Sequence, residues 1–497
     1  MSKGEDRPDL RETTLTGVRS IAGARLVAEL TALASVVVLA RLISPAEFGH
    51  AAIALVFVGV ATILGPLGLT AIVVQRPVLS PREVESAAFL SLSLGAALTA
   101  ATVVFSTVGV AATLFGDRTA DLVALASPAF LLVGLGAVPQ ALVQRELRFR
   151  RLGVFEATSV VAGAVTAVSL ALFGLEGESL VVGGVVVVGS TAVLAMVAVP
   201  LVRPRPSREG IRDVSGFATP VTLSSLVYLG FRNVDYVILG ARLSPAQVGF
   251  YWRAYQLGVE YQGKLTQIMM RVSFPVYSRA EGVAELKRLR LRIVRTHATV
   301  ILPLLAGFIA VAPALIPWLF GEAWEPAVVP AQILAVAGMA EAVTTGIGFL
   351  MIVLGRPGLL LAWNVLTLVA YGVMIAFLAQ YGLTWVSIGV AVFSVVSVVV
   401  LQAALMPMVI DLGIVDFWHD VKAGVITAAI VLPPLVGGRV LLEDIGVPVL
   451  PLLGLLTLVG TAIIAAVLRV LFGEVWNDLL VLCRRVSGRG TPIRRET

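Results

Sequence analysis

Charged side chains are scarce in this chain: they make up 14% of its 497 residues, whereas 58% of the residues are hydrophobic. Water-soluble domains carry about a quarter charged residues, so the composition excludes a soluble globular protein. One spanning helix with its connection takes roughly 35 residues, and the length therefore predicts about 14 membrane-spanning helices. We expect an all-α, polytopic membrane protein.

Cysteine and histidine are also rare. The single cysteine, Cys483, excludes an intramolecular disulfide, and the three histidines are far apart in the sequence. The sequence contains no phosphate-binding loop, nucleophile elbow or zinc motif, and the predicted exterior connections are no longer than about fifteen residues. It therefore predicts no catalytic residue, no metal site, no bound cofactor and no nucleic-acid partner, so we do not expect an enzyme.

Apolar stretches separated by charged residues, glycine and proline define the individual spans. The predicted spans are 18–40, 51–74, 87–114, 122–143, 153–174, 179–202, 217–241, 247–270, 297–320, 328–354, 358–380, 383–407, 421–441 and 447–472. The polar segment 1–16, followed by Arg25 and Glu29 inside the first apolar stretch, predicts a retained first helix in place of a cleaved signal peptide.

Lysine and arginine distinguish the two sides of the membrane. With these spans, about 29 of them fall on the side of the N-terminus and about 4 on the other side, namely Arg41, Arg118, Arg242 and Arg439. Because cytoplasmic connections are the basic ones, we expect a plasma-membrane protein with both termini in the cytoplasm. The basic segment 278–296 lies on this side, where it suits contacts with lipid headgroups.

An internal repeat divides the chain. ARLISPAEFGH at 40–50 matches ARLSPAQVGFY at 241–251, and LFGD at 114–117 matches LFGE at 319–322. Six spans, an even number, separate the copies, so both have the same orientation, as in parallel-repeat transporters. The predicted order is a cytoplasmic tail (1–16), an N-lobe of spans 1–6 (17–202), a linker (203–216), a C-lobe of spans 7–12 (217–410), spans 13 and 14 (411–472) and a basic cytoplasmic tail (473–497).

Charged and polar residues inside the spans are the candidate site, because such residues are costly in the bilayer and usually face a cavity or a partner. The candidates for lining a substrate cavity are Arg25, Arg232, Asn233, Tyr236, Arg253, Tyr255, Lys264 and Gln267. The candidates for binding a coupling ion, either a proton or sodium, are Glu29, Asp235, Glu260 and Glu341.

A purely structural role is the alternative for several of these residues. Arg25 and Glu29 are four residues apart, as are Glu260 and Lys264, and Arg232 and Asp235 are three apart. Each pair has the spacing of a neutralised intrahelical ion pair. Arg253 has no acidic residue at helical spacing, which favours a cavity for that residue.

Four segments around the second copy of the repeat resemble a known family. They are RNVDYVILGARLSPAQVGFYWRAYQL (232–257), FPVYSR (274–279), LFGEAWEPAVVPAQILAVAG (319–338) and LGRPG (354–358). They are similar to the polysaccharide transporters, the family of Wzx-type flippases, within the multidrug/oligosaccharidyl-lipid/polysaccharide (MOP) exporter superfamily. The resemblance covers about residues 15–410.

This resemblance implies a two-lobed transporter that flips an undecaprenyl-pyrophosphate-linked oligosaccharide from the cytoplasmic to the outer leaflet by alternating access. The substrate would be the repeat unit of a cell-surface polysaccharide, with a polymerase and glycosyltransferases as partners. Because one chain contains both lobes, a monomer is sufficient. Two other hypotheses stay open at this point: a cation-coupled drug or metabolite antiporter of the same superfamily, and a membrane scaffold that transports nothing.

Overall fold

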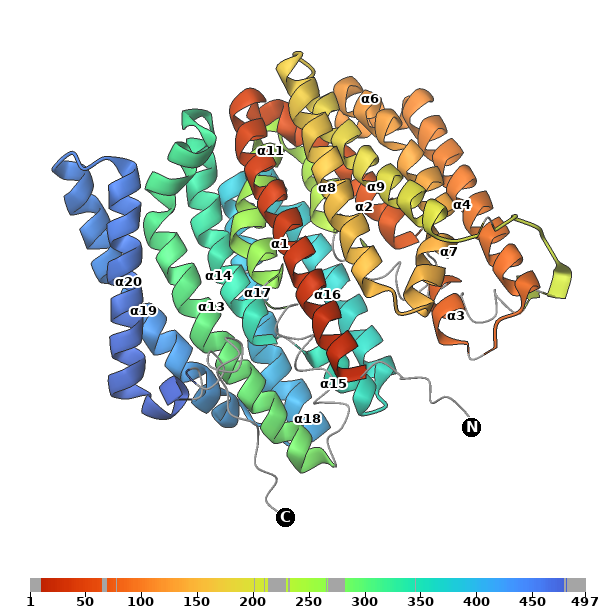
Figure 1. Ribbon diagram of the computed structural model, residues 1–497. Coiled ribbons are helices and arrows are strands. Elements are labelled where there is room, and N and C mark those ends of the chain that lie inside the picture. Colours follow the sequence, from red (N-terminus) through yellow and green to blue (C-terminus); the bar gives the residue numbers. More distant parts are fainter. Residues whose placement is uncertain are drawn as a thin grey trace. The chain divides into compact units, whose positions relative to one another are not determined.

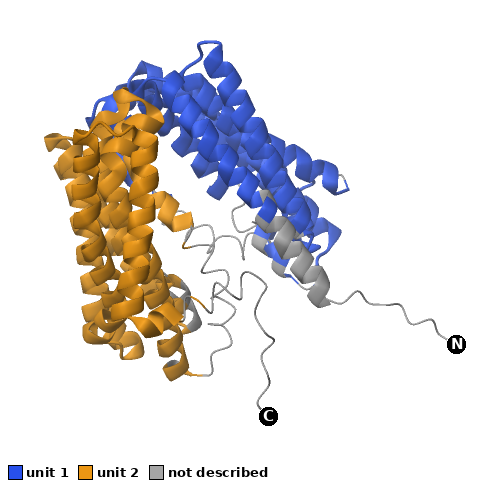
Figure 2. Cartoon of the chain, turned by 60° about the vertical axis from the view of Figure 1, so that its left-hand side comes forward, with its two compact units in different colours: residues 1–249 blue, residues 250–497 orange. Residues whose placement is uncertain are grey.

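The computed structural model describes residues 10–64, 69–76, 78–200, 202–209, 211–212, 229–230, 233–264, 266, 282–344, 346–477 and 480. Within these ranges the regular structure is helical and contains no strand (Figure 1). The chain packs as two compact units, Met1–Gly249 and Phe250–Thr497, which Figure 2 shows in different colours. The all-α class predicted from composition is confirmed.

The described helices of the first unit, besides a helical stretch at 233–242, have the following bounds. These are α1 (Leu10–Leu42), α2 (Pro45–Leu64), α3 (Leu69–Gln75), α4 (Pro81–Thr107), α5 (Val110–Phe115), α6 (Asp117–Ala126), α7 (Pro128–Arg145), α8 (Phe149–Leu172), α9 (Gly177–Ala198) and the first turns of α11 (Pro245–Tyr255). Helix α1 packs along α8, and α7 packs against both α4 and α9 (Figure 1). Two glycines let α4 and α7 approach closely, because a Cβ on Gly95 or Gly134 would press on backbone of the other helix.

The second unit continues α11 into a π-helical turn, η1 (Gln256–Glu260). Its further elements are α13 (Val283–Phe320), the 3₁₀ turn η2 (Glu322–Ala327), α14 (Val328–Thr344), α15 (Ile347–Val353), α16 (Pro357–Leu378), the 3₁₀ turn η3 (Ala379–Tyr381), α17 (Leu383–Val400), the π turn η4 (Leu401–Leu405), α18 (Met406–Ile410), α19 (Ile414–Asp444) and α20 (Val449–Leu471). Helix α13 packs against α14 and α19, and α20 packs against α19. An apolar cluster that includes Ala310, Leu435 and Leu456 joins these last helices.

Eleven helices in the described residues are long and apolar enough to cross a membrane. They coincide with eleven of the fourteen predicted spans. The other three are 18–40, 217–241 and 247–270. Helix α1 covers the first of these but contains several charged residues, and parts of the other two lie outside the described residues. The count of fourteen therefore stays a prediction. Span 328–354 is interrupted by a turn at Gly346 between α14 and α15, and span 51–74 covers α2 and α3, with residues 65–68 outside the described residues.

The basic segment before the ninth span is helical from residue 283 and belongs to α13, which is 38 residues long. At 1.5 Å per residue this helix measures about 57 Å, which exceeds the hydrocarbon core of about 30 Å. Leu286, Arg290, Val294 and Ala298, each one turn apart, are all buried. This buried stripe extends the helix beyond the apolar stretch, and hydropathy alone did not reveal it.

The two copies of the repeat place matching residues at matching corners. The turn before α6 contains Gly116 with φ of 84°, and the turn before η2 contains Gly321 with φ of 101°. In the first copy His50 Nδ1 lies 2.7 Å from the hydroxyl of Thr119. In the second copy the ring of Phe250 packs edge-on against that of Trp324, with 6.0 Å between centroids. Phe250 follows His50 by 200 residues and Trp324 follows Thr119 by 205, the two offsets of the sequence repeat.

Candidate functional site

The first charged pair predicted from sequence, Arg25 and Glu29, lies one turn apart on α1. Both side chains are half-buried, whereas Leu26 and Leu30 beside them are exposed and Ala28 is buried. The two charged groups thus lie at the border between the packed and the exposed faces of the helix.

The described polar residues of the seventh predicted span, 217–241, are buried or half-buried. Asn233 donates its side-chain amide to the carbonyl of Leu229 at 3.0 Å. Asp235 is 2% exposed, and its carboxylate accepts the backbone N–H of Tyr236 at 2.9 Å. Tyr236 is buried as well. Arg232, the predicted partner of Asp235, lies outside the described residues, so their pairing stays a prediction.

Arg253 is enclosed by aromatic rings. Its guanidinium carbon lies 5.0 Å from the ring centre of Phe320, 5.4 Å from Trp324 and 5.6 Å from Trp252. One end of the group donates to the side-chain oxygen of Gln256 at 2.6 Å, and the residue is 1% exposed. We name this group the aromatic cage. The cage buries Arg253 among the described residues, and cation–π attraction offsets the cost of this burial.

After the aromatic cage, the helix changes from α-helical to π-helical winding, and further residues of the predicted site lie on this part of the helix. Tyr255 packs against Tyr251, with 5.8 Å between ring centres, and the π turn η1 then ends at Glu260. Lys264 extends over the ring of Tyr261 at 5.3 Å. Glu260 and Lys264 are half-buried. Inserted π turns are frequent at functional sites. Gln267, the last residue of this set, lies outside the described residues.

Glu341, the remaining candidate for a coupling ion, is exposed on α14. Its neighbours Ala337, Ala340 and Ala342 are buried, and the hydroxyl of Thr344 donates to its main-chain carbonyl at 2.9 Å. A carboxylate exposed in the middle of an apolar helix is stable only where water or a polar partner reaches it. The position therefore requires a polar environment, either water or a polar partner, on this side of α14.

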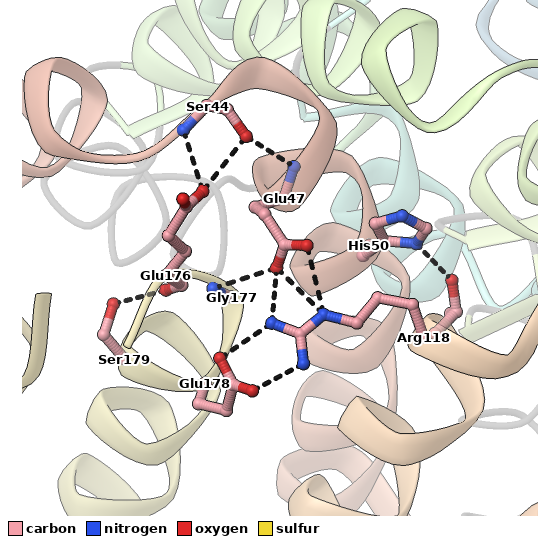
Figure 3. Close-up of polar contacts among 9 residues, drawn as sticks. Ser44, Glu47, His50, Arg118, Glu176, Gly177, Glu178 and Ser179 are labelled. Carbon is pink, nitrogen blue, oxygen red and sulfur yellow. Dashed lines mark hydrogen bonds and ion pairs between the residues drawn. The ribbon is translucent and has the colours of Figure 1, made fainter. Parts of the chain in front are cut away.

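An ion-pair network in the first unit was not among the predicted site residues (Figure 3). Arg118, at the start of α6, binds two carboxylates: its Nη2 donates to Glu47 at 2.7 Å and to Glu178 at 2.8 Å. Glu47 also accepts the backbone N–H of Gly177 at 3.2 Å. The side chains of Arg118, Glu47 and Glu178 are 35%, 21% and 28% exposed, so the network is in contact with solvent.

A second set of bonds completes this network. The hydroxyl of Ser44 donates to Glu176 at 3.1 Å and accepts the backbone N–H of Glu47 at 3.4 Å (Figure 3). The α1–α2, α5–α6 and α8–α9 corners are thereby tied together. We name Ser44, Glu47, Arg118, Glu176 and Glu178 the corner network. The sequence held one signal for it: Arg118 is among the few arginines on the arginine-poor side.

The described residues hold no group of three or more histidine, cysteine, aspartate or glutamate side chains that could bind a metal ion.

Comparison with known proteins identifies the family. Residues 38–329, more than half of the chain, match a family described as polysaccharide biosynthesis protein. The chain belongs to this family. It is 27% identical over 360 residues to the lipopolysaccharide biosynthesis protein WzxC of Escherichia coli (strain K12), an alignment that covers 72% of this chain and 73% of that protein. It is 26% identical over 379 residues to the teichuronic acid biosynthesis protein TuaB of Bacillus subtilis (strain 168), covering 74% and 77%.

Solved structures show the fold of this family member. The lipid II flippase MurJ, in an inward closed conformation, matches with a TM-score of 0.76 at 12% identity, over 91% of this chain and 99% of that one. A multidrug resistance MATE family transporter of the MOP superfamily, in an inward-facing conformation, matches with a TM-score of 0.56 at 16% identity, over 80% and 96%. The polysaccharide family expected from the sequence motifs is confirmed, and the two solved structures show its fold.

Proposed function

We propose that this protein flips a lipid-linked oligosaccharide, the repeat unit of a cell-surface polysaccharide, from the cytoplasmic to the outer leaflet by alternating access. Family membership and the relatives named for lipopolysaccharide and teichuronic acid biosynthesis support the substrate class. The fold shared with a lipid II flippase supports the mode of action. Undecaprenyl pyrophosphate is the lipid carrier that we propose.

The observation that carries this proposal is the placement of charged side chains on apolar helices. Arg25, Glu29, Glu260 and Lys264 are half-buried, and Glu341 is exposed. In hydrocarbon each of these groups would be costly, so we place them along a hydrated path. The cations suit a pyrophosphate, because ionised donors make the strongest hydrogen bonds to phosphate oxygens.

The proposal also covers the membrane topology of the protein and the ion gradient that drives transport. We propose a plasma-membrane transporter that works without catalysis, with both termini in the cytoplasm, sufficient as a monomer and acting beside a polymerase and glycosyltransferases. A proton or sodium gradient drives it through an accessible carboxylate. Glu29, Glu260 and Glu341 are accessible, whereas Asp235 is enclosed and would need an opening of its helix before it could exchange an ion.

Reconstitution of the purified protein in liposomes tests the function. The probe is a fluorescent undecaprenyl-pyrophosphate oligosaccharide, and the readout is the rate at which its sugars change their accessibility to a membrane-impermeant quencher. Replacing a charged donor to phosphate costs about 1.5–3 kcal/mol. We therefore expect the double variant Arg25→Gln and Lys264→Gln to flip the probe at least about tenfold more slowly than the wild type.

The matched control is Arg288→Gln, which removes an exposed arginine near the start of α13. It should flip the probe at the wild-type rate. Equal rates in the double variant and the control would remove Arg25 and Lys264 from the path. A folded wild type that moves no lipid-linked glycan would contradict the proposed function and favour the antiporter or the scaffold.

A further inference from the structure

The two copies of the SPA-x-x-G motif lie against each other within the first compact unit. Gly49 is in the second turn of α2, and Gly249 is in the second turn of α11. A Cβ atom on Gly49 would overlap the carbonyl oxygen of Pro245 and lie 3.0 Å from the amide nitrogen of Gly249. A Cβ on Gly249 would overlap the carbonyl oxygen of Pro45 and lie 3.1 Å from the amide nitrogen of Gly49. The contact is therefore reciprocal, and we name it the twin-glycine crossing.

The crossing is made of backbone. Glycine Cα–H groups face carbonyl oxygens of the other helix, and each such contact contributes about 0.5–1 kcal/mol. Small residues at such crossings let two helices touch without interlocking side chains. Two helices in this arrangement can part without the repacking of large side chains.

A serine caps the first turn of each of the two helices, α2 and α11. Ser44 accepts the backbone N–H of Glu47, and Ser244 accepts the backbone N–H of Gln247, each at 3.4 Å. Beside the two glycines, Phe48 and Val248 are each 1% exposed. If the crossing opened, these two apolar side chains would meet water.

We propose that the twin-glycine crossing is the outer closure of the transport path, and that it parts each time the substrate leaves toward the outer leaflet. The inference rests on the proposed function and its topology, which put the ends of spans 1 and 7 outside. The repeat makes the closure symmetric, because each copy of the motif contributes one glycine and one accepting carbonyl.

Cysteine labelling tests this closure without any lipid-linked glycan. The background is Cys483→Ser with Val248→Cys, and the reagent is a membrane-impermeant maleimide added to spheroplasts. In Gly49→Ala the new methyl group cannot fit the closed crossing. Because an overpacked contact costs about 1–3 kcal/mol, we expect labelling of the cysteine about tenfold faster than in the background.

Two control variants separate opening from general damage. Gly59→Ala is on the same helix, and a Cβ there meets nothing within 4 Å, so labelling should not change. Gly95→Ala breaks the similar close approach between α4 and α7, where its Cβ would lie 2.5 Å from the carbonyl oxygen of Phe130. It should lower the melting temperature by as much as Gly49→Ala does but leave labelling slow.

The second glycine makes the test independent of any one variant. Gly249→Ala should accelerate labelling as Gly49→Ala does, and the double variant should label no faster than either one, because both changes open one contact. Equal labelling of Gly49→Ala and Gly95→Ala, or additive effects in the double variant, would overturn the closure. Loss of flipping activity in the wild type, by contrast, would leave the labelling result intact and would count only against the proposed function.

Discussion

Where the α5–α6 turn meets the α1–α2 turn, Arg118 lies between two carboxylates that solvent can reach; where η2 meets α11 in the second copy, Arg253 lies among aromatic rings with 1% of its surface exposed. Both arginines join helices at a corner of the same repeat. The first does so through charged hydrogen bonds that water can replace, and the second through close packing. The repeat therefore preserves the position of a corner and leaves its chemistry free to change.

This difference predicts unequal sensitivity to mutation. An ion network in contact with water loses little when one bond breaks, because solvent screens the remaining charges. A buried cation in a cage contributes through packing and cation–π attraction together, and its removal leaves a cavity. We expect the second corner to be the more rigid of the two.

The largest effect should come from Arg253→Ala. It removes the cation from the rings of Phe320, Trp324 and Trp252 and leaves a buried void, which should cost about 3 kcal/mol or more. The measurement is the thermal melting temperature of the purified protein in detergent. Arg253→Lys should restore only part of the loss, since an ammonium group does not stack on aromatic rings as a guanidinium does. Wild-type melting of the alanine variant would show that the cage contributes no stability.

An intermediate effect should come from Arg118→Gln. The variant leaves Glu47 and Glu178 close together without their shared cation, and we expect a loss of about 1–2 kcal/mol. Because salt screens this repulsion, the difference in melting temperature from the wild type should shrink as sodium chloride is raised. The matching series on Arg253→Ala should be nearly independent of salt. The same salt dependence in both variants would remove the distinction between the two corners.

The smallest effect should separate the two caps. Ser44→Ala loses the cap on Glu47 and the bond to Glu176, and we expect a loss of about 1 kcal/mol. In Ser244→Ala the lost hydroxyl caps the backbone N–H of Gln247 and donates to the side chain of the same residue. We expect this variant to lose about 0.5 kcal/mol of stability. Melting of both variants side by side checks the order. The reverse order would mean that Glu176 contributes nothing to the first corner.

Much of the fold was predictable because it depends on local composition. Long apolar stretches predicted the helices, and the eleven described helices that are long and apolar enough to cross a membrane coincide with predicted spans. The repeat was predictable from SPA-x-x-G and LFG alone. The turn at Gly346 between α14 and α15 was not, because a hydropathy average extends across so short a change of direction.

The site was less predictable because its contacts join distant segments. The absence of an acidic residue near Arg253 favoured a cavity, yet Phe320 and Trp324 come from about seventy residues downstream and surround it. Arg118 finds Glu47 and Glu178 through tertiary packing in the same way. The exposure of Glu341 was equally invisible, since one sequence cannot tell which face of an apolar helix is packed.

The reciprocity of the twin-glycine crossing has an evolutionary meaning. Gly49 of the first copy contacts Pro245 of the second, and Gly249 of the second contacts Pro45 of the first. This reciprocal pattern is that of an isologous contact between two identical subunits. An even number of spans in each copy lets two such subunits be joined head to tail in one chain with their orientation in the membrane unchanged. The crossing therefore has the symmetry of an interface between two identical subunits, which is the arrangement that duplication and fusion of one gene would produce.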